Sequence, residues 1–130
     1  MYTNADGPAD GPAVTPGTLT LRLNHLRAGV PVVQASGCLD HMTAPGLQHL
    51  LDDQLAAAPW AIVIDLSALS VFKPDAVPTL VHVACRAGEA DIGLCLVTAD
   101  HTVTGALATA SVDQLFEIYP TTEAALHALS

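Results

Sequence analysis

Basic residues are scarce in this chain. Its 130 residues include 4 Lys and Arg against 13 Asp and Glu, which gives a formal net charge of −9. A chain this acidic repels nucleic-acid phosphates and anionic lipid headgroups, so we exclude DNA, RNA and charged membrane surfaces as partners. The charge favours solubility and a partner with a basic surface.

Long hydrophobic runs are also missing. No apolar stretch approaches the ~20 residues that span a bilayer. The first 17 residues have neither the basic segment nor the apolar segment of a secretion signal. We therefore expect a cytoplasmic protein that does not enter a membrane.

Cysteines are few and unpaired in pattern. Cys38, Cys85 and Cys95 form no C-x-x-C motif and stand within apolar stretches. This pattern predicts buried free thiols in a reducing compartment. No neighbouring base or cationic setting marks any of them as a catalytic thiol.

Motifs for catalysis, metals and nucleotides are absent as well. The six histidines (25, 41, 49, 82, 101 and 127) show no H-E-x-x-H spacing. The chain has no G-x-S-x-G elbow, no G-x-x-x-x-G-K-[ST] loop and no G-x-G-x-x-G turn. We predict no catalytic residues, no metal site and no cofactor, and hence a protein that is not an enzyme.

The sequence divides into a short N-terminal segment and one domain. Residues 1–17 repeat Asp, Gly and Pro, a composition that cannot build a core, so we expect a flexible acidic segment there. Residues 18–130 hold the apolar periodicity, and hydrophobic residues make up 51% of the chain. This length and composition suit a single packed domain.

Strand and helix patterns alternate along that domain. Strands are predicted at 19–24, 30–36, 60–66, 92–97 and 116–119. Helices are predicted at 43–55, 75–87, 100–108 and 121–129. The order β-β-α-β-α-β-α-β-α predicts an α/β fold with a mixed, mainly parallel sheet.

Local signals set the expected helix ends. Thr43 is the expected N-cap of the first helix, with Pro45 in its first turn, and Gly88 is the expected stop of the second. Trp60 is expected to pack beside the buried strand that follows it. The inner face of the second helix is expected to carry Val77, Leu80, Val81 and Ala84.

Four short pieces occur in a recognisable order. They are Ser36-Gly37-Cys38-Leu39-Asp40 with Thr43-Ala44, Val63-Ile64-Asp65-Leu66-Ser67, Val112-Asp113-Gln114-Leu115-Phe116, and the closing segment from Tyr119 to Leu126. In this order and spacing the chain, from about Leu19 to Leu129, resembles the STAS domains. These are typified by the bacterial anti-sigma factor antagonists.

The resemblance implies a phosphorylation switch and shows where this chain departs from it. Antagonists of the family carry D-S-S/T-G at the start of the second long helix, and a partner anti-sigma factor kinase phosphorylates the second Ser or Thr. The unphosphorylated antagonist binds that kinase and frees the sigma factor. This chain has Lys73-Pro74-Asp75-Ala76 at that point, so Asp75 stands at the phosphoacceptor position. Cys38 also replaces the usual Glu.

Two compatible interpretations of Asp75 follow. As an N-cap, its carboxylate gains roughly 0.3–1 kcal/mol from the helix dipole, and Pro78 then falls at N3, where its missing N–H breaks no helical bond. Alternatively, Asp75 is a fixed anion, with a charge of about −1 against about −1.5 to −2 for a phosphate.

We therefore expect a non-enzymatic interaction domain that docks on an anti-sigma factor of the serine-kinase type or on a related regulator. The expected docking residues are Asp40, His41, Lys73, Asp75 and Val77. One alternative is a small ligand- or nucleotide-sensing domain, or a small enzyme. It would use Asp40, His41 and His101, which are expected at the same edge of the sheet, beyond the carboxyl ends of the strands. Another is a scaffold within an assembly of several STAS domains. The sequence leaves the oligomeric state open.

Overall fold

Strands and helices alternate as the sequence predicts in the computed structural model, which describes residues 19–27 and 29–129. The strands are β2 (Leu19–Arg27), β3 (Val30–Leu39), β4 (Ala61–Phe72), β5 (Gly93–Val97) and β6 (Glu117–Tyr119). The helices are α1 (Ala44–Ala56), α2 (Val77–Glu89), α3 (His101–Thr109) and α4 (Thr122–Ala128), with 3₁₀ turns η2 (Pro74–Ala76) and η3 (Asp113–Leu115). The expected flexible segment 1–17 lies outside the described residues.

The five strands form one mixed sheet in the order β2-β3-β4-β5-β6. β2 pairs antiparallel with β3, and every later neighbour is parallel. Gly29 in the hairpin connection has a φ of +77°, a left-handed conformation that glycine adopts without strain. The predicted α/β class and the mainly parallel sheet are therefore confirmed.

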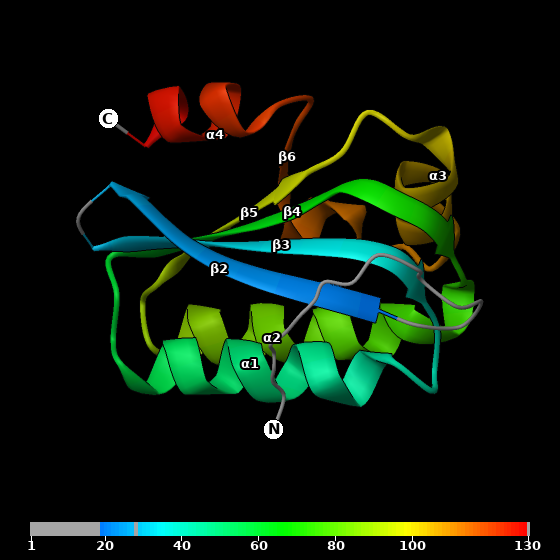
Figure 1. Cartoon of the computed structure of the whole chain (residues 1–130), viewed down its shortest axis with the longest axis horizontal. Helices are drawn as coiled ribbons and strands as arrows, with labels where there is room; N and C mark the ends of the chain where they lie inside the picture. Colours follow the sequence, from blue (N-terminus) through cyan, green and yellow to red (C-terminus); the bar gives the residue numbers. More distant parts are fainter. Residues whose placement is uncertain (1–18, 28, 130) are drawn as a thin grey trace.

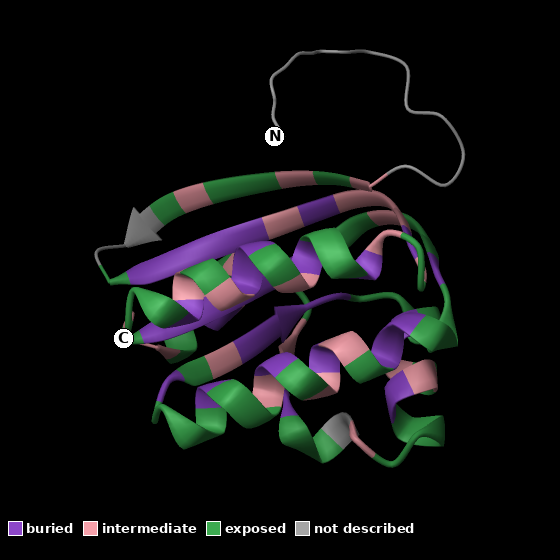
Figure 2. Ribbon diagram, turned by 90° about the horizontal axis from the view of Figure 1, so that it is seen from below, coloured by how far each residue is buried: buried purple, intermediate pink, exposed green. Residues whose placement is uncertain are grey.

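Helices cover both faces of this sheet. α1 and α2 lie side by side on one face and α4 lies on the other (Figure 1). Seen from the helix side, buried purple positions on α1 and α2 alternate with exposed green ones (Figure 2), as amphipathic helices require. The larger core lies between the sheet and these two helices and includes Leu47, Leu51, Ile62, Ile64 and Leu80.

A smaller apolar cluster lies between the sheet and α4. It contains Val32, Val63, Cys95 and Ala125, with Leu126 packed against it. β4 is buried on both faces up to Leu66, which explains its almost continuous apolar sequence. None of the helices formed by the described residues is long and apolar enough to cross a membrane.

β4 is longer than the sequence predicts. The apolar run suggested an end at residue 66 and a loop over 67–75, but the strand continues to Phe72. Its second half pairs with β3, where Ala68 lies opposite Ser36 and Phe72 opposite Leu39. Several side chains of this half are exposed, so its sequence has no continuous apolar pattern to reveal the strand.

The helix α2 begins and ends two residues later than expected, and Gly88 lies within it instead of stopping it. Its buried residues are Val77, Leu80, Val83 and Ala87. The expected inner residues Val81 and Ala84 are only partly buried. The buried face of α2 is therefore rotated about the helix axis relative to the face that the spacing predicts, because α2 packs against both α1 and β5.

Two further expectations about single residues are wrong. Only Cys95 is buried; Cys38 is half-buried and Cys85 is exposed, because Cys85 falls on the outer side of α2. Trp60 precedes β4 but leaves 59% of its surface exposed. Its backbone N–H donates to the Gly29 carbonyl at 2.9 Å, which ties it to the hairpin connection at the far end of the sheet from the carboxyl ends of β3 and β4.

Candidate functional site

The connections that follow β3 and β4 meet at one edge of the sheet. β3 and β4 are parallel and end level with each other, since Leu39 lies opposite Phe72. The Lys73 backbone N–H donates to the Leu39 carbonyl at 2.9 Å. The loop 40–43 and the segment 73–76 are thus held together, at the right of Figure 1.

A direct side-chain contact joins these two segments. Nδ1 of His41 lies 2.8 Å from Oδ2 of Asp75, across 34 residues of sequence. The side chains are 67% and 47% exposed, respectively. The pair therefore lies on the surface, where a partner can reach it.

Asp75 does not cap α2, contrary to one of the two interpretations of its role. It lies within the 3₁₀ turn Pro74–Ala76, and the N-cap of α2 is Ala76, with no side-chain cap hydrogen bond. Pro78 consequently falls in the first two positions of the helix and not at N3. The carboxylate of Asp75 contacts the His41 ring and not the amides of α2.

Asp40 organises the loop before α1. Its Oδ1 accepts hydrogen bonds from the backbone N–H groups of Met42, at 2.9 Å, and Thr43, at 3.1 Å. Burial alone would raise the pKa of Asp40, but these bonds to its charged form outweigh that effect and lower it. Asp40 is therefore ionised, and it places a negative charge just before the start of α1.

Thr43 occupies the predicted N-cap position but makes no side-chain cap hydrogen bond. Its hydroxyl donates instead to the Cys38 carbonyl at 2.9 Å and accepts from the Asp40 backbone N–H at 3.0 Å. The Asp40 carboxylate thus bonds the amides of Met42 and Thr43, the two residues just before α1. Pro45 lies in the first turn as predicted.

Cys38 lies behind this loop. Its Sγ is 3.5 Å from Oδ2 of Asp40. Burial, followed by the hydrogen bond and the charge of Asp40, raises the pKa of the Cys38 thiol. The thiol therefore stays protonated near neutral pH, and the site offers no thiolate nucleophile.

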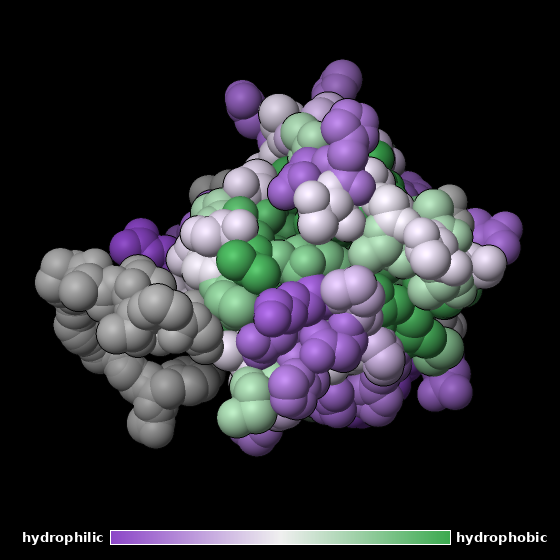
Figure 3. Space-filling view, turned by 90° about the vertical axis from the view of Figure 1, so that its right-hand side faces the viewer, coloured by the Kyte–Doolittle hydropathy of each residue, from purple (hydrophilic) through white to green (hydrophobic). Residues whose placement is uncertain are grey.

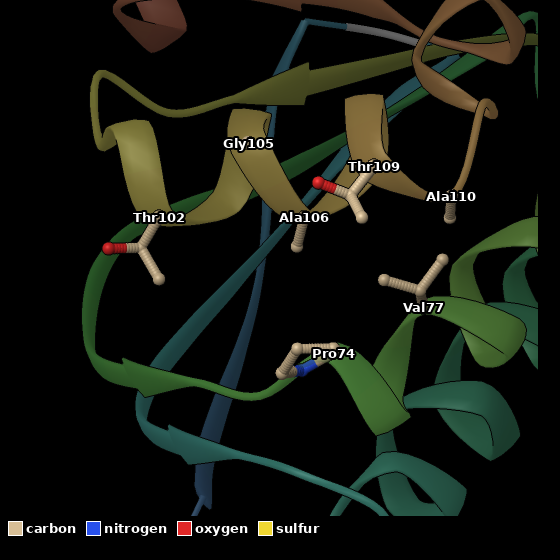
Figure 4. Close-up of a pocket in the computed structure, with 7 residues that line it drawn as sticks. All are labelled: Pro74, Val77, Thr102, Gly105, Ala106, Thr109 and Ala110. Atoms are coloured by element: carbon tan, nitrogen blue, oxygen red, sulfur yellow. The ribbon is translucent and has the colours of Figure 1, made fainter.

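A groove lies next to the Asp75 segment. It has a volume of about 300 Å³ and is lined by Pro74, Val77, Thr102, Gly105, Ala106, Thr109 and Ala110. In Figure 4, side chains from α3 face Pro74 and Val77 across the open space. The sequence offers Asp100 or Thr102 as the cap of α3, and the structure has Asp100, since its Oδ1 accepts from the Thr102 N–H at 2.8 Å.

This groove was not predicted from the sequence. The signal was present in α3, where Thr102, Gly105, Ala106 and Thr109 recur at the helical spacing i, i+3, i+4 and i+7. Such small residues on one face leave space when the helix packs against another segment. That segment could not be identified before the tertiary structure was known.

Three of the five expected docking residues are exposed. Asp75, His41 and Lys73 are exposed and Asp40 is half-buried, whereas Val77 is only 5% exposed and belongs to the core. Met42 in the loop 40–43 and Val71 near the end of β4 were not among the expected residues, but they are exposed apolar residues at 74% and 42%. On the corresponding face, hydrophilic and hydrophobic side chains adjoin one another (Figure 3).

His101, which was considered together with Asp40 and His41, begins α3 and is exposed. No ion pair joins it to either residue among the described side chains. Within the described part of the chain, no group of three or more His, Cys, Asp or Glu residues is arranged to hold a metal ion.

Comparison with known families gives one match. The model of the STAS domain family matches residues 24–125. No curated protein matches the chain.

Solved structures share this fold. An anti-sigma factor antagonist from Mycobacterium paratuberculosis superposes with a TM-score of 0.77 at 28% identity, covering 89% of this chain and 97% of that chain. The anti-sigma factor antagonist SpoIIAA in its unphosphorylated form gives 0.72 at 15% identity, covering 85% and 96%. A putative antagonist from Thermotoga maritima gives 0.72 at 16% identity, covering 85% and 92%.

Proposed function

Because the chain belongs to the STAS domain family, we propose that it is an interaction domain of the anti-sigma factor antagonist type. Its partner is an anti-sigma factor of the serine-kinase type or a related regulator. The 28% identical antagonist from Mycobacterium paratuberculosis supports this function, since the two chains align over nearly their whole lengths.

The observation that carries the proposal is the position of Asp75. The resemblance places the phosphoacceptor of the antagonists at this residue, and its carboxylate is 47% exposed beside the loop that follows β3. A carboxylate has no hydroxyl to accept a phosphoryl group. Asp75 therefore presents a permanent negative charge where other members gain and lose one.

The docking surface combines charge with apolar contact. Its members are Asp40, His41, Met42, Val71, Lys73 and Asp75. Val77 contributes through the adjoining groove, where an apolar side chain of the partner finds space beside Pro74 and Ala106. Interfaces gain most of their affinity from a few such buried contacts, whereas charges at the edge mainly set orientation and association rate.

The net charge of the chain also indicates what kind of surface the partner presents. With a net charge of −9, the chain attracts a basic surface and repels an acidic one. A partner that presents arginine or lysine opposite Asp75 fits this surface. Association should accordingly slow as ionic strength rises.

The test is binding to the anti-sigma factors of the same genome, measured by calorimetry. Asp75→Lys should weaken binding at least ~10-fold, because the variant places a cation against a basic surface. Asp53→Lys is the matched control, since Asp53 is an exposed carboxylate on α1 that also contacts a histidine. An equal loss of affinity in both variants would show that only the net charge matters, and it would contradict docking at Asp75.

A second candidate function, sensing of a small ligand, is favoured by the groove alone. Its volume of about 300 Å³ lies at the lower end of ligand pockets. A thermal-shift screen with nucleotides and small metabolites tests it, because a ligand of the folded state raises the apparent Tm. Loss of such a shift in Ala106→Phe would assign the ligand to the groove.

A further inference from the structure

The carboxylate of Asp75 is already engaged within the molecule. Its Oδ2 contacts Nδ1 of His41 at 2.8 Å, and the two residues come from different connections of the sheet. A partner that approaches this surface therefore meets a histidine–aspartate pair and not an isolated anion. This distinguishes the chain from a simple permanent mimic of a phosphorylated antagonist.

We propose that His41 is an internal competitor for Asp75: a basic side chain of the partner reaches the carboxylate only by displacing the imidazole, and docking weakens when His41 is protonated. The proposal rests on the proposed function, because it assumes that the partner presents a cation to Asp75. It adds a specificity-determining residue and a dependence on pH.

The exposure of both side chains makes the displacement possible. His41 is 67% exposed and Asp75 is 47% exposed, so neither is locked in place by packing. Exposed ion pairs are weak, and their side chains exchange readily with water. The imidazole can therefore swing away without disturbing the fold.

The direction of the pH effect follows from the charges. Histidine is the side chain that ordinarily changes charge between about pH 5 and 8. The imidazolium binds the carboxylate more strongly than the neutral ring does. Once displaced, it also remains beside the incoming cation and repels it. Docking should therefore strengthen as the pH rises.

The neighbouring groups do not share this titration. Asp40, on the same loop as His41, has a lowered pKa and stays ionised, while the raised pKa of Cys38 keeps the thiol neutral. Lys73 is a cation two residues before Asp75. The first turns of α1 and α2 contribute no acidic residue. Among these groups, only His41 is a side chain of the type that ordinarily changes charge over this range. His101, at the start of α3, is of the same type, but no ion pair joins it to Asp75 among the described side chains.

The experiment uses a peptide of six arginines as the basic probe. Its contact with Asp75 is followed by NMR through the side-chain carboxyl carbon of the labelled protein, at about pH 5.5 and about pH 8. In the unaltered protein the peptide should bind at Asp75 about two- to five-fold more tightly at the higher pH, the range that an exposed ion pair provides. His41→Ala should bind as tightly at the lower pH as at the higher one.

Two variants complete the test. His49→Ala is the matched control, because His49 forms a comparable exposed pair with Asp53 on α1, with 3.8 Å between Nε2 and Oδ2; it should keep the pH dependence. Asp75→Asn removes the negative charge and should abolish binding of the peptide at this position. Equal binding of the peptide to the unaltered protein and to His41→Ala at both pH values overturns the proposal.

Absence of any peptide contact at Asp75 in His41→Ala also overturns it, since the carboxylate is then unavailable even without its competitor. These outcomes do not depend on the natural partner. Failure of the anti-sigma factors to bind would instead count against the proposed function, so the two failures are distinguishable.

Discussion

The hydroxyl of Thr122 donates a hydrogen bond of 3.1 Å to Oδ2 of Asp65, a carboxylate that is only 8% exposed. Thr122 is the first residue of α4, and Asp65 lies in β4, 57 residues earlier. The other oxygen, Oδ1, accepts from the backbone N–H and the hydroxyl of Ser67. This polar contact fixes the start of α4 on the sheet beside its small apolar cluster.

Replacing Thr122 by valine should loosen α4. The variant removes one donor from a buried carboxylate, a loss of about 1–3 kcal/mol in the free energy of unfolding. Urea denaturation measures the stability, and hydrogen exchange of the α4 amides locates the change. Thr20→Val, at an exposed position of β2, is the control. Equal effects of the two substitutions would contradict a specific role for the Asp65 contact.

Replacing Asp75 by serine should restore a phosphoacceptor. An anti-sigma serine kinase with ATP should then transfer one phosphate to residue 75, because the variant supplies the hydroxyl that forms the phosphoester. The unaltered protein and Asp53→Ser should take none. Mass spectrometry maps the phosphate. Labelling of the unaltered protein at Ser67 or Ser70 would show that the switch lies elsewhere.

Acid should destabilise the loop before α1 through Asp40. The pKa of Asp40 is lowered in the folded protein, so its contribution is present above the ordinary value of 3.8 and is lost as the pH falls through the lowered pKa. Asp40→Asn should lower the Tm by about 2–6 °C at neutral pH. The difference in Tm between the two proteins should shrink below about pH 4. A difference that is constant with pH would contradict this explanation.

The three cysteines should react with N-ethylmaleimide in a definite order. Cys85 is exposed and should react first, and Cys38 more slowly because its thiol has a raised pKa. Burial, with a smaller contribution from Glu117, raises the pKa of Cys95 to about 11, so Cys95 should react only after unfolding. Mass spectrometry after timed quenching measures the order. Equal rates for Cys85 and Cys95 would contradict the burial of Cys95.

Periodicity in the sequence was sufficient for the elements of the fold. Leu47, Leu50, Leu51 and Leu55 lie on one stripe at helical spacing, which predicts the helix over 43–55, and all four residues are buried in α1. The caps of α3 and α4 could be narrowed to two neighbouring candidates each, Asp100 or Thr102 and Thr121 or Thr122. The structure has Asp100 and Thr121, whose side chains bond an amide two or three residues later. Interactions of this range are local, so the chain encodes them directly.

The candidate site was predictable only in part. The predicted parallel sheet places Asp40, His41, Lys73 and Asp75 at one edge, beyond the carboxyl ends of the strands, and the structure has these residues in the connections after β3 and β4. Val77 was expected both on the inner face of α2 and among the docking residues, and it is buried, because its neighbours come from the core and from α3. The groove was missed because its two walls lie about one helix and one strand apart in sequence.

The sequence by itself determined the order of strands and helices, the acidic charge and the carboxylate at residue 75. Only the tertiary structure decided which group that carboxylate contacts. Asp75 lies in the 3₁₀ turn before α2, and the parallel pairing of β3 with β4 brings His41 within 2.8 Å of it. The reason is physical. Helical periodicity depends on residues a few positions apart, whereas a contact across 34 residues exists only after the sheet has aligned the ends of its strands.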